Sequence, residues 1–315
     1  MAVTHIMLAA ALLAISIVTP IMADDMCVSK RSAQAALTKK VQKEIYDLQH
    51  PADCSKAKFL HCDSKGGNIN GMGSRVFWLS RCIAKGFDTG RTVVLDTAQS
   101  GTAEMWSPFE PWSSCTMADV KKANGRVVRW HSQDNEGKVE EGVKGAIVPK
   151  VYASKGYAWW KAQELAYVLR PTAATKAALE KKKQALGWGK GDIVHGMQVR
   201  RTDKVHGCAK NSPVKCKAEA PLRPLKDFGE VLHSAAERSA RSDKSDAKKV
   251  FLASDDPSVR KEARALSGFS FLPFEPAPKR VIGKNIGSRA LKDALDMLML
   301  SDTEVLVFTY SSGYG

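Results

Sequence analysis

Apolar and polar positions alternate with two different periods in the carboxyl-terminal half of the chain. Short apolar runs of strand length take turns with longer stretches in which apolar residues recur at helical spacing. Strands and helices that alternate in this way are typical of parallel βαβ units. We therefore predict strands at 192–199, 249–253, 269–272 and 304–310, with helices at 224–239, 257–266 and 288–300 between them.

The amino-terminal half has a less regular pattern. Apolar residues at helical spacing predict helices at 33–48, 74–85, 157–169 and 174–186, and β-branched runs predict strands at 91–96 and 126–131. A glycine-rich segment at 187–191 is typical of a linker. The pattern divides the chain into an apolar leader at 1–23, a stem or packing helix at 24–50 and two α/β domains at 51–188 and 189–315.

The leader is apolar from residue 6 to residue 23 except for Ser16, Thr19 and Pro20, and two aspartates follow it. Such a run is either a cleaved signal peptide or a short signal anchor in the membrane. Ala23 is an acceptable cleavage position and Pro20 would disturb a spanning helix, which favours cleavage. Either alternative places the rest of the chain in the secretory pathway, and the seven cysteines fit that oxidising compartment.

Composition favours a globular protein with anionic partners. Of the 315 residues, 44% are apolar, and 48 lysines and arginines against 33 acidic residues give a formal charge of +15. Lysine clusters such as 181–183 are usually solvated helix faces. No basic stripe interleaved with aromatic residues is present, so we do not expect nucleic acid as a partner.

Charge gathers where the strand at 192–199 ends, because Arg200-Arg201-Thr-Asp203-Lys204 follows it directly. Ligands of open α/β sheets bind outside the carboxyl ends of the strands. Arg200 and Arg201 would point to opposite faces of an extended chain, so one can hold an anionic ligand while the other anchors the loop or pairs with Asp203. A plain surface ion pair is the alternative.

The sequence from Gly196 to Val205 resembles the signature strand of the α-1,6-fucosyltransferases, a family that includes N-glycan core enzymes and bacterial chitin-oligosaccharide enzymes. Further matches follow in register, and they span residues 50 to 312: Asp53-Cys-Ser-Lys-Ala-Lys58, Trp159-Trp160, Leu169-Arg-Pro171, Leu252-Ala-Ser-Asp-Asp-Pro-Ser258, Leu295-Asp296 and Val307-Phe-Thr-Tyr-Ser-Ser312.

This resemblance implies an α/β fold of the GT-B type, with two Rossmann-like halves, the second ending after its last strand. It also implies GDP-fucose as donor, an N-glycan or chitin-type acceptor with N-acetylglucosamine, inversion at the anomeric carbon, no metal cofactor and a place in the Golgi lumen or outside the cell.

The resemblance implies a donor site on residues of both halves. Arg200, with Lys204 or Lys65 and two serines, would neutralise the departing GDP, and Glu219 would deprotonate the acceptor hydroxyl. Asp296, inside an apolar stripe, must be paired if it is buried, and in the family it accepts hydrogen bonds from guanine. The remaining candidates around the nucleotide are Gln198, Arg201, Asp203, Asp255, Asp256, Ser311, Ser312, Gly71 and Gly73.

Asp255 and Asp256 follow the predicted strand at 249–253 and precede Pro257. Asp256 is a good helix cap, and this structural role leaves Asp255 as the freer carboxylate.

Four departures from the family pattern bear on activity. Gln198 stands where the family has a histidine, no tyrosine follows Asp96 at the expected place, an insertion at 206–218 precedes Glu219, and the sequence ends at Gly315. These departures motivate an alternative, a GDP- or glycan-binding protein without turnover, and they are also consistent with a fragment of a longer protein.

The family pattern also implies disulfides between Cys54 and Cys115 and between Cys62 and Cys82. Cys208 and Cys216 lie close enough in sequence to clip their own loop, which leaves Cys27 without a partner. A metal site is the competing interpretation of the cysteines, but no Cys-x-x-Cys or paired histidine spacing supports it.

Overall fold

The computed structural model describes residues 20–63, 72–97, 103–131, 147–202, 205, 207, 221–239, 245, 247–274 and 286–309. By its contacts the chain divides into two units, Met1–Asp47 and Leu48–Gly315. The candidate site lies in the second unit.

Helix α1, Pro20–Gln49, contains the predicted helix at 33–48 and begins earlier, with a proline in its first turn. Ion pairs one turn apart, Lys40 with Glu44 and Lys43 with Asp47, lie on its surface. The leader at 1–23 lies mostly outside the described residues. Among the helices that the structure describes, none is both long enough and apolar enough to cross a membrane.

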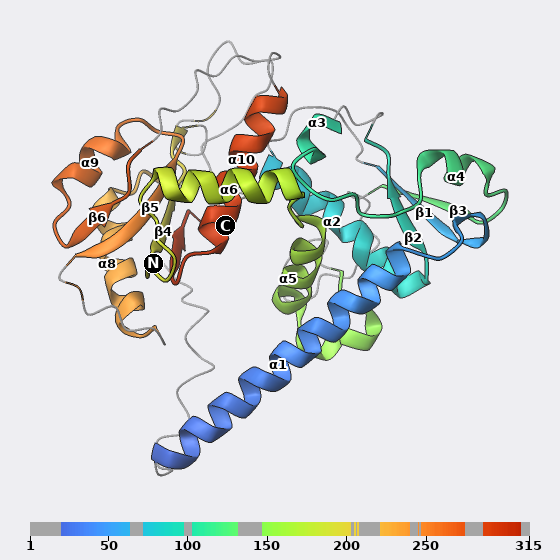
Figure 1. Cartoon of the computed structure of the whole chain (residues 1–315), viewed down its shortest axis with the longest axis horizontal. Coiled ribbons are helices and arrows are strands. Elements are labelled where there is room, and N and C mark those ends of the chain that lie inside the picture. Colours follow the sequence, from blue (N-terminus) through green and yellow to red (C-terminus); the bar gives the residue numbers. More distant parts are fainter. Residues whose placement is uncertain are drawn as a thin grey trace, which may run out of the picture. The chain divides into compact units, whose positions relative to one another are not determined.

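The first sheet has three parallel strands in the order β2-β1-β3: β1, Phe59–Asp63; β2, Thr92–Leu95; and β3, Val127–His131 (Figure 1). The sequence pattern predicts β2 and β3 but not β1, although all five residues of β1 are buried. His61, Cys62 and Asp63 fill three of the five positions, so the central strand has no apolar run. The other elements of this half are η1, Cys54–Lys56; α2, Met72–Thr89; α3, Ala103–Trp106; α4, Met117–Lys122; η2, Lys150–Lys155; and α5, Tyr157–Val168.

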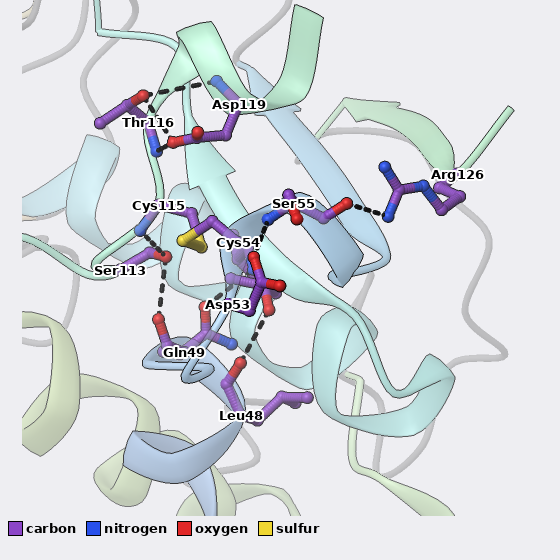
Figure 2. The surroundings of a disulfide bond; sticks show 12 residues. Leu48, Gln49, Asp53, Cys54, Ser55, Ser113, Cys115, Thr116, Asp119 and Arg126 are labelled. Carbon is purple, nitrogen blue, oxygen red and sulfur yellow. Dashed lines mark hydrogen bonds between the residues drawn. A yellow bond between two sulfur atoms is a disulfide. The ribbon is translucent and has the colours of Figure 1, made fainter. Parts of the chain in front are cut away.

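Two disulfides join elements of this half. Cys54 bonds to Cys115 and Cys62 to Cys82, with Cα atoms 5.6 Å and 6.2 Å apart, and both are the pairings that the resemblance implies. Figure 2 shows that hydrogen bonds surround the first of them: the amide of Cys115 donates to Ser113 Oγ, which donates to the carbonyl of Gln49 at 2.9 Å. The disulfide therefore lies within a polar network that orders the chain before β1.

The second sheet has four parallel strands in the order β6-β5-β4-β7: β4, His195–Val199; β5, Lys248–Ser254; β6, Phe269–Phe271; and β7, Leu306–Phe308. Helices α8, Leu225–Glu237; α9, Val259–Ala265; and α10, Ile286–Ser301 connect them (Figure 1). All seven predicted elements of this half are confirmed. The mixed α/β class and the two parallel halves expected of the GT-B type are confirmed as well.

Helices cover both faces of the second sheet. Leu225 and Leu232 of α8 and Val259 of α9 bury one face with Met197 and Val199. The opposite face is buried by α10 and by α6, Ala173–Ala185, through the cluster Leu179, Leu186, Phe251, Leu295 and Met299. Helix α6 therefore packs with the second sheet, although the boundary predicted at 188/189 groups it with the first half.

Glycine is required at one position of the central strand. A Cβ atom at Gly196 would lie 2.8 Å from Thr303 Oγ1 and 2.9 Å from Leu306 Cδ1. The close approach allows β7 and the turn before it to pack against β4.

Candidate functional site

The site is built at the carboxyl edge of the second sheet, where β4 and β5 end side by side. Val199 pairs with Ser254 in the parallel register, and Ser254 Oγ donates to the carbonyl of Val199 at 2.7 Å. The residues that follow the two strands are thereby placed together, at the edge where open α/β sheets bind ligands.

Arg201 anchors this edge and is almost fully buried, with 5% of its side chain exposed. Its Nη1 and Nη2 atoms donate to the two carboxylate oxygens of Glu262 at 2.5 Å and 3.0 Å, and Nη2 also donates to the carbonyl of Arg223 at 2.6 Å. These hydrogen bonds, which Arg201 donates to Glu262, raise the pKa of Arg201 and lower the pKa of Glu262. One of the two arginines is thus the anchor, as predicted, and its main partner is Glu262 of α9.

Arg200 points to the more open side of the strand end, with about a quarter of its side chain exposed. Its Nε atom lies 3.1 Å from Asp255 Oδ2, and its amide donates to Thr309 Oγ1 at 3.0 Å. The first contact orients the guanidinium and the second fixes the backbone beside the end of β7.

Asp255 is as fully engaged as the neighbouring Asp256, so the prediction that it is the freer of the two is wrong. Besides Arg200, it accepts hydrogen bonds from the amide of Arg201 at 2.9 Å and from Thr202 Oγ1. The strand register is the reason, because the residue after Ser254 meets the backbone that follows Val199.

Asp256 accepts from the amide and hydroxyl of Ser258 at 2.8 Å and 2.7 Å. It orders the turn before α9, whose cap position is held by Ser258. The prediction that Asp256 itself caps the helix is therefore wrong by two residues, although its role is structural. Its Oδ2 atom also lies 3.7 Å from Arg201 Nη1.

A pocket lies beside these strand ends. Apolar side chains and a cluster of charges line it, and the lining includes Lys182, Leu186, Ser254, Phe274, Lys292 and Asp296. Ser254 lines this pocket and is also hydrogen-bonded to Val199, so the pocket adjoins the strand end that Arg200 follows.

Asp296 is paired, as expected for a carboxylate in an apolar stripe. Lys182 Nζ lies 2.9 Å from its Oδ1 atom and Lys292 Nζ lies 2.8 Å from its Oδ2 atom. Helical spacing could have indicated Lys292, which lies four residues before Asp296. Nothing in the sequence indicates Lys182, or Glu262 as the partner of Arg201, because each comes from a distant segment.

Gln198 is buried on β4 opposite Ala253 of the pocket wall, so its side chain lies on the pocket side of the sheet. Among the residues that the structure describes, its Oε1 atom has no hydrogen-bond partner. Buried acceptors are usually satisfied, so this amide is consistent with a ligand contact.

Most of the other predicted site residues lie outside the described part of the chain, and their roles stay predictions. These are Lys65, Gly71, Asp203, Lys204, Cys208, Cys216, Glu219, Ser311 and Ser312. Gly73 is described and buried at the start of α2. Cys27 lies in α1, where only the backbone is described.

A family model described as the α-(1,6)-fucosyltransferase N- and catalytic domains matches residues 8–151 and 147–314. The chain belongs to this fucosyltransferase family. The resemblance carried by the strand around Arg200 is thereby confirmed over nearly the whole sequence.

Two α-(1,6)-fucosyltransferases are similar along most of the chain. The one from Drosophila melanogaster is 27% identical over 300 residues, which cover 86% of this chain and 45% of that protein. The one from Caenorhabditis elegans is 26% identical over 313 residues, which cover 89% of this chain and 52% of that protein. The chain thus spans about half the length of these fucosyltransferases.

A solved structure of the α-1,6-fucosyltransferase NodZ, soaked with GDP-fucose, also aligns with this chain. The identity is 14%, the alignment covers 82% of this chain and 90% of NodZ, and the TM-score is 0.41. The family assignment rests on the sequence match.

Proposed function

We propose that this fucosyltransferase-family chain binds GDP-fucose at the carboxyl edge of its second sheet. It would transfer fucose in α-1,6 linkage to a glycan with N-acetylglucosamine, with inversion and without a metal ion. The observation that carries it is the position of Arg200, an oriented guanidinium at the end of the central strand, beside a pocket that contains Asp296.

The diphosphate would bind at Arg200. A guanidinium carries its charge at every working pH and matches phosphate oxygens with a planar fork. Asp255 holds Arg200 through Nε at 3.1 Å, which orients the rest of the group before a ligand binds. Arg201 cannot take this role, because its own fork is turned inward to Glu262.

The base would bind in the pocket of Asp296, with Gln198 as a further hydrogen-bonding group. The apolar wall of Leu186 and Phe274 suits a planar ring, and the ionised carboxylate accepts hydrogen bonds from base N–H groups.

The chemistry would proceed through an oxocarbenium-like state with charge growing on GDP. Arg200 with Lys204, Lys65, Ser311 and Ser312 would stabilise that charge, and Glu219 would remove the proton of the acceptor hydroxyl. These roles outside the described residues come from the resemblance. Side-chain cations would supply the charge that a metal ion supplies in other enzymes, which supports a transfer without a metal ion.

The acceptor and the compartment follow from the same proposal. An N-glycan or a chitin-type oligosaccharide fits a family named for α-(1,6)-fucosyl transfer, and the two disulfides fit the secretory pathway, either the Golgi lumen or the outside of the cell.

The test is transfer of radiolabelled fucose from GDP-fucose to a core N-glycan and to a chitin oligosaccharide, with EDTA present. We expect transfer by the wild type and loss of GDP binding and transfer in Arg200→Ala. Arg238→Ala, which removes an exposed arginine at the end of α8, is the matched control and should keep both. GDP binding without transfer would reduce the proposal to a nucleotide-binding protein, and absence of GDP binding would refute it.

A further inference from the structure

The pocket beside β5 holds an unusual arrangement of charge, two ammonium groups on one carboxylate. Asp296 receives Lys182 at Oδ1 and Lys292 at Oδ2, at 2.9 Å and 2.8 Å. The cluster carries a net charge of +1 and lies against apolar side chains such as Leu186 and Phe274. Water is partly excluded there, so hydrogen bonds to these charges gain strength.

The two lysines are not equivalent. Lys182 comes from α6 and exposes 8% of its side chain. Lys292 lies in α10, one turn before Asp296, and exposes 30% of its side chain. Lys182 is therefore held in place and fixes Asp296. Lys292 reaches the same carboxylate with a more exposed side chain, whose flexible stem can turn toward a ligand.

The cluster places a cationic donor beside an anionic acceptor, and guanine presents the complementary edge. Its O6 atom accepts, and its N1–H and N2–H groups donate. Adenine presents an amino group where guanine has O6, so the ammonium group would face a donor. An ionised carboxylate has about four acceptor positions, so Asp296 can keep Lys182 while it accepts the two base N–H groups.

We propose that Lys292 determines nucleotide specificity at this site by donating a hydrogen bond to the O6 atom of a guanine base, while Lys182 positions Asp296 for N1 and N2. This inference rests on the proposed function, because it assumes that the base of the donor nucleotide enters this pocket. It adds a residue that selects guanine over adenine.

The test is calorimetric titration of the full chain with GDP, IDP and ADP, in the wild type and in Lys292→Met. IDP keeps O6 and N1–H but lacks the N2 amino group. We expect Lys292→Met to weaken GDP and IDP by about tenfold or more each, since a hydrogen bond to a charged group is lost, and to leave ADP unchanged. The ratio of GDP to IDP affinity should stay constant, because the N2 contact belongs to Asp296.

Two further variants sharpen the test. Lys226→Met is the matched control, because it removes an exposed lysine of α8 that lies 3.6 Å from Glu230, one helical turn away. It should change none of the three affinities. Lys292→Gln keeps a neutral donor and should retain part of the preference for GDP over ADP. Circular dichroism of each variant shows whether it is folded.

The outcomes separate the two proposals. If the wild type binds GDP and Lys292→Met keeps the same preference for GDP over ADP, the role of Lys292 is refuted and the nucleotide site stands. If the wild type binds none of the three nucleotides, the proposed function fails and the role of Lys292 falls with it.

Discussion

Arg201 and Glu262 form a two-pronged ion pair that joins the end of the central strand β4 to helix α9. Glu262 also accepts the amide of Leu225 at 2.7 Å, so the same carboxylate ties in the start of α8. Three segments that are distant in sequence meet at one side chain. The pair thus fixes the strand end from which Arg200 projects toward the site.

Glu262→Gln should destabilise the fold. The change removes the main counter-charge of the buried Arg201 and leaves it only the carboxylate of Asp256, 3.7 Å from Nη1, so we expect a loss of about 2 kcal/mol in the free energy of unfolding. Glu230→Gln removes a largely exposed ion pair with Lys226 on α8 and should cost less than about 0.5 kcal/mol. Urea denaturation of both variants measures the difference. Equal losses would show that the buried pair stabilises the fold no more than an exposed pair does.

The contribution of Glu262 should depend on pH in the acid range. Arg201 lowers the pKa of Glu262 in the folded chain, so the unfolded chain binds a proton at this site first as the pH falls. The stabilisation is present above the unfolded pKa, about 4.3, and is lost as the pH falls through the lower folded pKa. The stability difference between wild type and Glu262→Gln should therefore be constant from pH 7 to about pH 5 and shrink toward pH 3. Denaturation at each pH tests this, and a difference that grows on acidification would contradict it.

The two disulfides should differ in their stabilising effect because they close loops of different length. Cys54 and Cys115 are 61 residues apart, and Cys62 and Cys82 are 20 apart. Loop closure in the unfolded chain predicts a stabilisation of about 4 kcal/mol for the first and about 3 kcal/mol for the second. Denaturation of the Cys54→Ala/Cys115→Ala and Cys62→Ala/Cys82→Ala double variants measures both, and a clearly greater loss for the shorter loop would show that packing around Cys62 outweighs loop entropy.

The second sheet could be predicted from the sequence because local periodicity there agrees with tertiary structure. Strands such as β5 are apolar on both faces, and amphipathic helices separate them. The central strand of the first sheet could not be predicted in this way. Its polar residues are buried beside partners that are distant in sequence. One of them is Asp96, whose Oδ2 atom lies 3.2 Å from His61 Nε2.

The same limit applies to the site. The sequence indicates which charged residues stand at strand ends, because that follows from position along the chain. It does not indicate which of them anchors the loop and which faces a ligand, because this depends on the register of neighbouring strands. Asp255 is occupied by the turn after β4 only because Val199 lies opposite Ser254.

The two adjacent aspartates offer a final test of this division of work. Asp255→Asn weakens the contact that orients Arg200. It also weakens the hydrogen bonds that the amide of Arg201 and the hydroxyl of Thr202 donate to this side chain. Under the proposed function, the variant should lower GDP affinity by about tenfold. Asp256→Asn changes the turn before α9 and a 3.7 Å contact with Arg201, but no contact with Arg200, so it should cost about 1 kcal/mol of stability and leave GDP affinity within about twofold. Calorimetric titration with GDP separates them. Equal effects of the two variants would mean that the turn as a whole, and not the orientation of Arg200, governs binding.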